Sequence, residues 1–219
     1  MFYDDKKAHG LKFSPFKALV APRPIAWVSS MDVAGALNLA PFSFFNAMAE
    51  SPPTIVFAPN NPRPNGGSKD TLANIEQVGE FVVNFCNWDL REAMNQSSAH
   101  VPPEVDEFKL AGLTPLASVN VRVPRVKEAP VALECTFMFR VRLPSNNPKI
   151  ENNAVFGRVV GVHIADELIV DGRIDMLKYR PIARLGYMDY TVLDNVFSMD
   201  RPDESLEDYE AKRRVRAAE

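Results

Sequence analysis

The most constraining feature of this chain is the alternating run VALECTFMFRVRL over Val131–Leu143. Its odd positions are apolar or cysteine, whereas its even positions include Glu134, Arg140 and Arg142. Successive side chains of a β-strand point to opposite faces, so the pattern predicts a long antiparallel strand with one buried face. A strand of this length needs partners, and a mostly-β fold follows.

Further strands are expected elsewhere in the chain. Gly157 and Gly161 allow a bend or bulge of the kind that closes a barrel. Helical signals are fewer, the clearest being over residues 70–78, which Gly79 ends. Many short strands and few helices predict a closed or nearly closed β-barrel. The other expected strands are 25–30, 36–40, 54–58, 81–85 and 154–164.

We expect a single domain over residues 1–199 and a charged C-terminal tail or helix over residues 200–219. The tail fits either a solvated surface helix or an arm that grips a second copy. The net charge of −3 gives no electrostatic support for binding nucleic acid or an anionic membrane.

We expect a cytoplasmic protein. The first ten residues carry charges where a signal peptide needs an apolar core, and no run reaches the ~18 apolar residues of a membrane span. Cys86 and Cys135 have no pairing motif, which suits a reducing compartment, and we expect both in the core.

The usual motifs of hydrolases and zinc enzymes, G-x-S-x-G, H-E-x-x-H and C-x-x-C, are absent. No G-x-G-x-x-G follows a strand, so a doubly wound dinucleotide fold is unsupported. His9, His100 and His163 lie far apart in the sequence, and no metal site is expected.

One loop has the chemistry of an anion site. Residues 63–71 read RPNGGSKDT and lead into the predicted helix 70–78, whose free N–H groups favour a phosphate. The alternative is an ordinary glycine turn before a helix capped by Asp70 or Thr71, with the lysine in solvent. The candidate phosphate ligands are Ser68, Lys69 and Thr71.

The stretch 35–49, GALNLAPFSFFNAMA, is neither a clean strand nor a clean helix. Pro41 cannot donate to a β-ladder, so we expect it to interrupt the strand. Backbone groups freed there need partners, and a flat heterocycle could supply them, with side-chain bonds from Asn38, Ser43 and Asn46. The alternative is a strand bent at a barrel corner with its polar groups paired internally.

The blocks RPIAWVSS, NLAPFSFF, SKDTLANI and VPRVKEAPVALECTF, taken in order, resemble the flavin reductase-like, FMN-binding split-barrel family, which includes flavoredoxin. The resemblance runs from about Arg23 to Arg184. It implies a homodimeric, six-stranded antiparallel Greek-key β-barrel with flanking helices, and FMN near the dimer interface.

The resemblance also implies residue roles. His163 becomes a catalytic candidate beside the flavin or nicotinamide, the alternative being a packed or surface histidine. Arg184 and Tyr187 could reach the same site. The implied FMN contacts are Ser29 and Ser30 near the ribityl-phosphate, Asn38, Leu39, Ala40 and Ser43 along the ring, largely through main-chain bonds, and Ser68, Lys69 and Thr71 at the phosphate.

Flavin chemistry accounts for the missing catalytic triad, because the cofactor carries the reaction and the protein positions it. The implied activity is hydride transfer from NADH or NADPH to bound flavin, and on to free flavin, a partner oxygenase or another acceptor. Two hypotheses compete with it: a flavoredoxin-like FMN electron carrier reduced by a protein partner, and a non-redox FMN-binding or scaffold protein.

Overall fold

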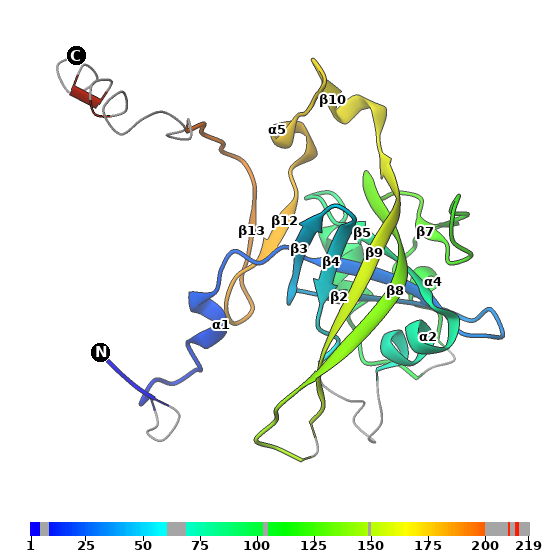
Figure 1. Ribbon diagram of the computed structural model, residues 1–219, viewed down its shortest axis with the longest axis horizontal. Helices are drawn as coiled ribbons and strands as arrows, with labels where there is room; N and C mark the ends of the chain where they lie inside the picture. Colours follow the sequence, from blue (N-terminus) through cyan, green and yellow to red (C-terminus); the bar gives the residue numbers. More distant parts are fainter. Residues whose placement is uncertain are drawn as a thin grey trace.

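The computed structural model describes residues 1–4, 9–60, 69–102, 105–148, 150–199, 210 and 213–214. Its centre is a seven-stranded antiparallel sheet in the order β2-β1-β5-β8-β9-β4-β3 (Figure 1). The mostly-β prediction is confirmed. The strands are β1 (Ala26–Met31), β2 (Leu37–Phe42), β3 (Phe45–Glu50), β4 (Pro53–Phe57), β5 (Glu80–Phe85), β8 (Val131–Leu143) and β9 (Asn152–Ile164).

The sheet has seven strands where six were expected, and the additional strand β3 lies in the stretch 35–49. The prediction that Pro41 interrupts the ladder is also wrong, because Pro41 lies within β2 and pairs with Trp27. Strand β2 is an edge strand, and the N–H of Leu39 points away from β1 to the carboxylate of Glu107. Pro41, two residues on, faces the same open side, where its missing N–H costs no ladder bond.

Strand β8 has the bounds that the alternation predicts, but the expectation of one buried face is wrong, because residues on both faces are buried at its start and its second half is exposed. Strand β5 pairs with residues 131–136 alone, and the remainder of β8 pairs only with β9. These two strands extend as a hairpin beyond the rest of the sheet (Figure 1). Phe139, Val141 and Leu143 are therefore 49%, 42% and 42% exposed.

Two of the three buried clusters in the described part of the chain, an inner and an outer one, lie on opposite faces of β1, which is buried on both faces. Val28 belongs to the inner cluster inside the barrel, whereas Trp27 belongs to the outer cluster. Cys86 and Cys135 are buried and unpaired, as predicted. The inner cluster consists of Ala26, Val28, Phe42, Ile55, Phe57, Leu72, Ile75, Phe81, Val83, Cys135 and Val155.

Helix α2 (Asp70–Val78) buries Leu72 and Ile75 and ends at Gly79, which has φ 76°. Its existence and end are as predicted, but its beginning is not. The N-cap residue is Lys69, which forms no side-chain cap bond, and the Thr71 hydroxyl donates to Asn38 instead. The capping role expected for Asp70 or Thr71 is therefore wrong, because both residues lie inside the helix.

Short elements complete the described part of the chain. Helix α1 packs against the β12–β13 hairpin, where Ala18 approaches Gly186 (Figure 1). The segment 200–219 lies almost wholly outside the described residues. The remaining elements are α1 (Phe16–Leu19), α3 (Arg91–Gln96), α4 (Glu107–Leu110), α5 (Met176–Tyr179), η1 (Asp166–Leu168), and the pairs β6 (Pro115–Leu116) with β7 (Arg125–Val126), β10 (Ile169–Val170) with β11 (Arg173–Ile174), and β12 (Ile182–Arg184) with β13 (Tyr190–Val192).

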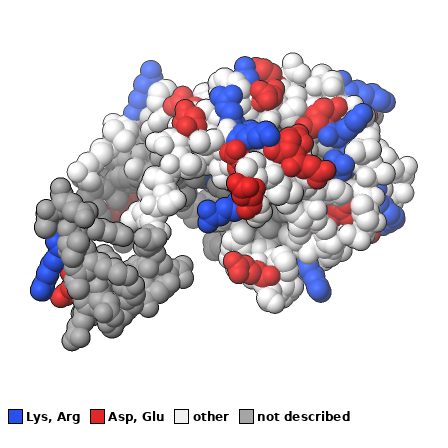
Figure 2. Space-filling model, turned by 90° about the horizontal axis from the view of Figure 1, so that it is seen from above, with Lys and Arg blue, Asp and Glu red and all other residues white. Residues whose placement is uncertain are grey.

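The surface carries charges of both signs. On the face shown in Figure 2, acidic and basic side chains are interspersed. Within the described ranges, no helix is long and apolar enough to cross a membrane.

Candidate functional site

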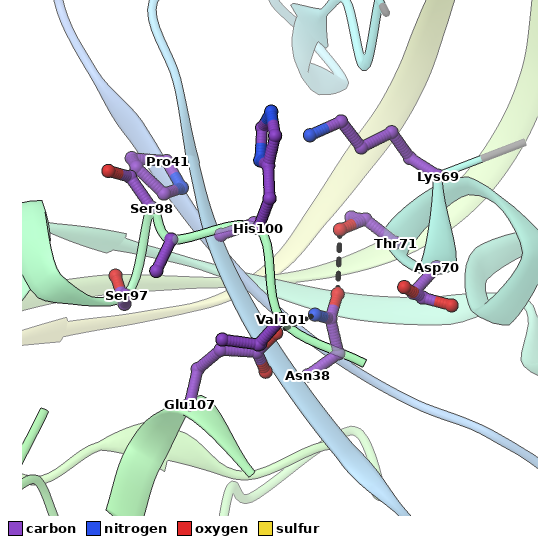
Figure 3. A pocket seen from close by; sticks show the side chains of 12 residues that line it. Asn38, Pro41, Lys69, Asp70, Thr71, Ser97, Ser98, His100, Val101 and Glu107 are labelled. Atoms are coloured by element: carbon purple, nitrogen blue, oxygen red, sulfur yellow. Dashed lines mark hydrogen bonds between the residues drawn. The ribbon is translucent and has the colours of Figure 1, made fainter. Parts of the chain in front are cut away.

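A small cavity of about 100 Å³ lies where the start of α2 meets β2, α4 and the segment 97–101 (Figure 3). Its walls come from three regions that are far apart along the chain: 38–41, 69–71 and 97–107. They are predominantly polar. The lining residues are Asn38, Ala40, Pro41, Lys69, Asp70, Thr71, Ser97, Ser98, Ala99, His100, Val101 and Glu107.

A second cavity of about 330 Å³ adjoins the first, because Pro41 and Ser98 line both. Ser43, Arg184 and Tyr187 are among the residues that line it. Arg184 donates to the main-chain oxygen of Tyr187 at 2.5 Å and to the hydroxyl of Tyr190. A positive charge therefore lies at one end of the second cavity, held in place by its neighbours.

Asn38 is the centre of a buried hydrogen-bond network beneath the small cavity. Its Oδ1 accepts from Thr71 Oγ1 at 2.7 Å and from Ser30 Oγ at 3.3 Å. Its Nδ2 donates to Glu107 Oε1 at 3.0 Å, and Asn74 donates to Ser30 at 3.2 Å. The network fixes the orientation of the Asn38 amide, because its oxygen and nitrogen have different partners.

Glu107 is an acidic group at the floor of the cavity, and only 8% of it is exposed. Its carboxylate accepts from Asn38 and from the N–H of Leu39 at 3.1 Å. Burial raises the pKa of Glu107, and the hydrogen bonds from Leu39 and Asn38 oppose this only in part. Asp70 also lines the cavity.

Lys69 is half-buried at the opposite wall. Burial lowers the pKa of its ammonium group, and the charge of Glu107 opposes that shift. The side chains of Lys69 and His100 point toward the same space above Thr71 (Figure 3). Neither makes a hydrogen bond within the part of the chain that the structure describes.

Five of the residues predicted to contact a ligand are brought together here. Asn38, Ala40, Lys69 and Thr71 line the small cavity, and Ser43 lines the second. Arg184 and Tyr187, which could reach the site, also line the second cavity.

The other predicted contacts lie elsewhere. Ser30 is buried behind Asn38, while Ser29 points to the opposite face of β1 and donates to Pro124 at 2.7 Å. Leu39 is wholly buried in the outer cluster, and its N–H is taken by Glu107 rather than offered to a ligand. Asn46 is exposed on β3. Ser68 is outside the described residues.

His163 is absent from the lining of both cavities. Its Nε2 lies 2.5 Å from Oε1 of Glu134, a wholly buried carboxylate that also accepts from the N–H groups of Val119 and Asn120. The imidazole is thus part of a carboxylate-centred contact between β8, β9 and the segment 119–120. Its catalytic role stays a prediction.

Sequence reasoning missed several residues of the site. Glu107 follows Asp106, which caps α4 by accepting from two main-chain N–H groups, but nothing local indicates that its side chain turns toward β2. His100 was considered only as a metal ligand. Arg23 lines the second cavity and donates to the main chain of Leu185 and Val20. Burial and the charge of Arg184 lower the pKa of Arg23.

The arrangement suits a ligand with two different ends. The small cavity combines a half-buried cation with hydroxyl and amide groups and is too small for an aromatic ring system. The second cavity falls in the size range of small-molecule sites. Among the described residues, no group of three or more His, Cys, Asp or Glu side chains could hold a metal ion.

The chain is similar to several known proteins. Residues 19–180 match the family described as "Flavin reductase like domain". An uncharacterized protein of Halalkalibacterium halodurans is 39% identical over 183 residues, which are 84% of this chain and 87% of that protein.

Among solved structures, nitrilotriacetate monooxygenase component B from Bacillus cereus matches with a TM-score of 0.83 at 33% identity, covering 91% of this chain and 98% of that one. The 2-nitrobenzoate 2-nitroreductase of Pseudomonas fluorescens has a TM-score of 0.78 at 29% identity, with 93% and 96% covered.

Two more distant structures share the fold alone. A Shewanella frigidimarina protein described as having a split barrel domain has a TM-score of 0.76 at 23% identity, with 92% and 99% covered. Flavoredoxin of Desulfovibrio vulgaris has a TM-score of 0.72 at 18% identity, with 90% and 98% covered.

Proposed function

The chain belongs to the flavin reductase-like family of split-barrel proteins, and from that premise we propose that it is an FMN-dependent oxidoreductase. The proposed reaction passes hydride from NADH or NADPH to bound flavin, and then passes electrons to free flavin or another acceptor. The observation that carries the proposal is the pair of adjoining cavities of unequal size and chemistry.

In this proposal, the two cavities hold the two ends of FMN. A phosphate suits the cavity of about 100 Å³, where Lys69 and Thr71 lie, and the flavin ring suits the cavity of about 330 Å³ that begins at Pro41 and Ser43. The half-buried Lys69 ammonium supports placing the phosphate in the small cavity, because burying a cation without a partner is unfavourable and a phosphate would supply one.

At the phosphate end, Lys69 would supply charge, and the main-chain N–H groups in the first turn of α2 would point at the same group. Each charge-assisted hydrogen bond of this kind contributes about 1.5–3 kcal/mol. Glu107 holds Asn38, and Asn38 accepts from Thr71, so the wall of the site is fixed before a ligand arrives.

At the other end, bound FMN would supply the hydride and electron chemistry that the side chains lack. Pro41 and Ser43 would border the ring, and Arg184 would favour negative charge nearby.

The names of two relatives support a redox function. The Bacillus cereus protein is a component of a monooxygenase and the Pseudomonas fluorescens protein is a nitroreductase. For this chain, a partner oxygenase, free flavin and a small organic acceptor are all consistent with the site. An electron carrier reduced by a protein partner is the second candidate, since flavoredoxin has the same fold.

A titration with FMN tests the proposal. The purified protein should bind FMN with a red-shifted or structured flavin absorbance band, and anaerobic NADH or NADPH should bleach it. Replacing both Lys69 and Thr71 by alanine should weaken FMN binding, whereas Lys109→Ala, an exposed lysine on α4, should not. Bleaching by neither nucleotide would favour the electron carrier. A protein without affinity for FMN would refute both.

We also propose a homodimer, with the hairpin of β8 and β9 covered by a second copy. The exposed residues Phe139, Val141 and Leu143 form an apolar row, and Phe139 stacks on Phe156 with ring centroids 4.7 Å apart. Exposed apolar surface of this kind marks interaction sites. Light scattering should give twice the chain mass, and Val141→Glu should reduce it. An unchanged mass in that variant would reject this surface.

A further inference from the structure

His100 is a group of the small cavity that neither the fold nor the proposed chemistry has used. It lies on the segment after α3, across the cavity from Lys69, and the two side chains point into the same space (Figure 3). Its imidazole is exposed and makes no hydrogen bond to any described residue. The imidazole of His100 is therefore free to contact a ligand that also contacts Lys69.

One lysine does not balance the charge of a phosphate bound in this cavity. Lys69 is the permanent cation among the described residues that line the cavity. A phosphate ester carries between −1.5 and −2 charges near neutral pH, because its second pKa is about 6. Lys69 supplies a single positive charge against it, so a second cation beside the phosphate would strengthen binding.

We propose that His100 is the second cation of the phosphate site, that it is protonated when the phosphate is bound, and that FMN binding therefore takes up a proton. The proposal rests on FMN as the ligand of these cavities. Imidazole is the side chain that changes charge between pH 5 and 8, and a phosphate beside it favours the charged form.

Other titratable side chains that line the cavity could also make FMN binding depend on pH. Lys69 and Asp70 come from the start of α2 and Glu107 from α4, whereas β2 and the segment 97–99 contribute no titratable side chain. The pKa of Glu107 is raised, so its carboxylate is protonated more readily as pH falls and then repels a phosphate less. This effect, like protonation of His100, favours FMN binding at lower pH.

The sign of the effect follows directly. With a charged imidazole the phosphate site has two positive groups, Lys69 and His100, and with a neutral imidazole it has only Lys69. Near pH 6 the phosphate itself gains negative charge, which acts in the opposite direction. Above that range the loss of imidazole charge dominates, and the affinity for FMN should fall as pH rises from about 6.5 to 8.5. A variant without the imidazole should lose most of this fall.

The test compares FMN with riboflavin, which has the same ring but no phosphate. In His100→Gln the dissociation constant for FMN at pH 6 should rise about ten- to one-hundred-fold, the value of one charge-assisted hydrogen bond. The constant for riboflavin should be unchanged. His100→Lys should retain tight FMN binding and lose the fall in affinity near neutral pH. His9→Gln, which removes a histidine that lines neither cavity, is the matched control.

Calorimetry measures the proton directly. Titrations of FMN in two buffers that differ in ionisation enthalpy should show net proton uptake at pH 7 by the wild-type protein, and less uptake by His100→Gln. Fluorescence quenching of the flavin gives the same affinities independently, without any turnover.

The outcomes separate the inference from the proposed function. If wild-type protein binds FMN but His100→Gln leaves its affinity and proton uptake unchanged, the inference is wrong and the proposed function stands. If His100→Gln weakens FMN and riboflavin equally, His100 does not act on the phosphate, and the inference is again wrong. If the wild-type protein binds neither flavin, both fail.

Discussion

Replacing Glu134 by glutamine tests whether the buried carboxylate of this β8 residue stabilises the fold. Glu134 is wholly buried and accepts three hydrogen bonds: from Val119 N–H at 2.7 Å, from Asn120 N–H at 2.6 Å and from His163 Nε2 at 2.5 Å. An amide has one acceptor oxygen, so its NH₂ group must face at least one of these donors.

The magnitude follows from this count. A buried donor without a partner costs about 1–3 kcal/mol, and loss of the charge on the remaining acceptor weakens the other bonds by about 1 kcal/mol. Glu134→Gln should therefore lower the free energy of unfolding by about 2–4 kcal/mol, a large part of the ~5–15 kcal/mol typical of a domain.

The matched control is Glu151→Gln. Glu151 pairs with Arg142 at 3.3 Å, with the two side chains 43% and 72% exposed, and surface pairs of this kind contribute about 0–1 kcal/mol. Urea unfolding followed by tryptophan fluorescence and circular dichroism measures both variants. A loss for Glu134→Gln no larger than that for Glu151→Gln would refute the reasoning.

The pH dependence of the difference in unfolding free energy between wild type and Glu134→Gln provides a second test. Burial by itself raises the pKa of Glu134, but hydrogen bonds from His163, Val119 and Asn120 outweigh it and hold the pKa below its usual range. A carboxyl with a lowered folded-state pKa stabilises the protein above its unfolded pKa of about 4.3 and loses that contribution as pH falls. The gap between wild type and Glu134→Gln should therefore be full at pH 6–7 and narrow below pH 4.

Three further predictions concern packing, the edge strand and the thiols. Gly157→Ala should destabilise the protein by about 1–3 kcal/mol, because its Cβ would lie 2.4 Å from the ring of Phe81; a neutral result in urea unfolding would contradict the close approach. Pro41→Ala should change the free energy of unfolding by less than about 1 kcal/mol, since the restored N–H faces the open side of β2; a gain much above 1 kcal/mol would show that the ladder lacked a bond there. Burial raises the pKa of Cys86 to about 12 and raises that of Cys135 further, so iodoacetamide at pH 7.5 should label neither in the folded protein by mass spectrometry, and rapid labelling of either would contradict this.

Helix α2 shows which features of an element the local sequence pattern can predict and which it cannot. Its apolar spacing and terminal Gly79 predict its residues and its end, because both depend on neighbours within a few positions. Its first turn could not be predicted in the same way. Whether Thr71 caps the helix or donates to Asn38 depends on β2, which is more than thirty residues earlier in the chain.

The residues of the candidate site likewise fall into those that local sequence predicts and those that it does not. Asn38, Lys69 and Thr71 were recognised because each sits in an unusual local sequence, and the fold brings them to one cavity. Glu107 and His100 lie in sequences with no such signal. The pairing of Glu107 with Leu39 is made across 68 residues, and no local feature encodes it.

His163 shows the opposite case, in which a residue that looks functional has a structural partner. The sequence places it correctly on β9, because alternation and the glycines define that strand. Only the register of β9 on β8, shifted by a bulge after Glu134, sets its imidazole against that carboxylate.

The sequence by itself determined most of the barrel strands, helix α2, the family and the chemical character of the two candidate ligand-binding segments, since these depend on residue type and short spacing. The tertiary structure decided the seventh strand, the tolerance of Pro41 on an edge, and the meeting of Lys69, His100 and Glu107 in one cavity. Such features depend on which strand lies beside which, and that order is settled by burial of the whole core rather than by any segment alone.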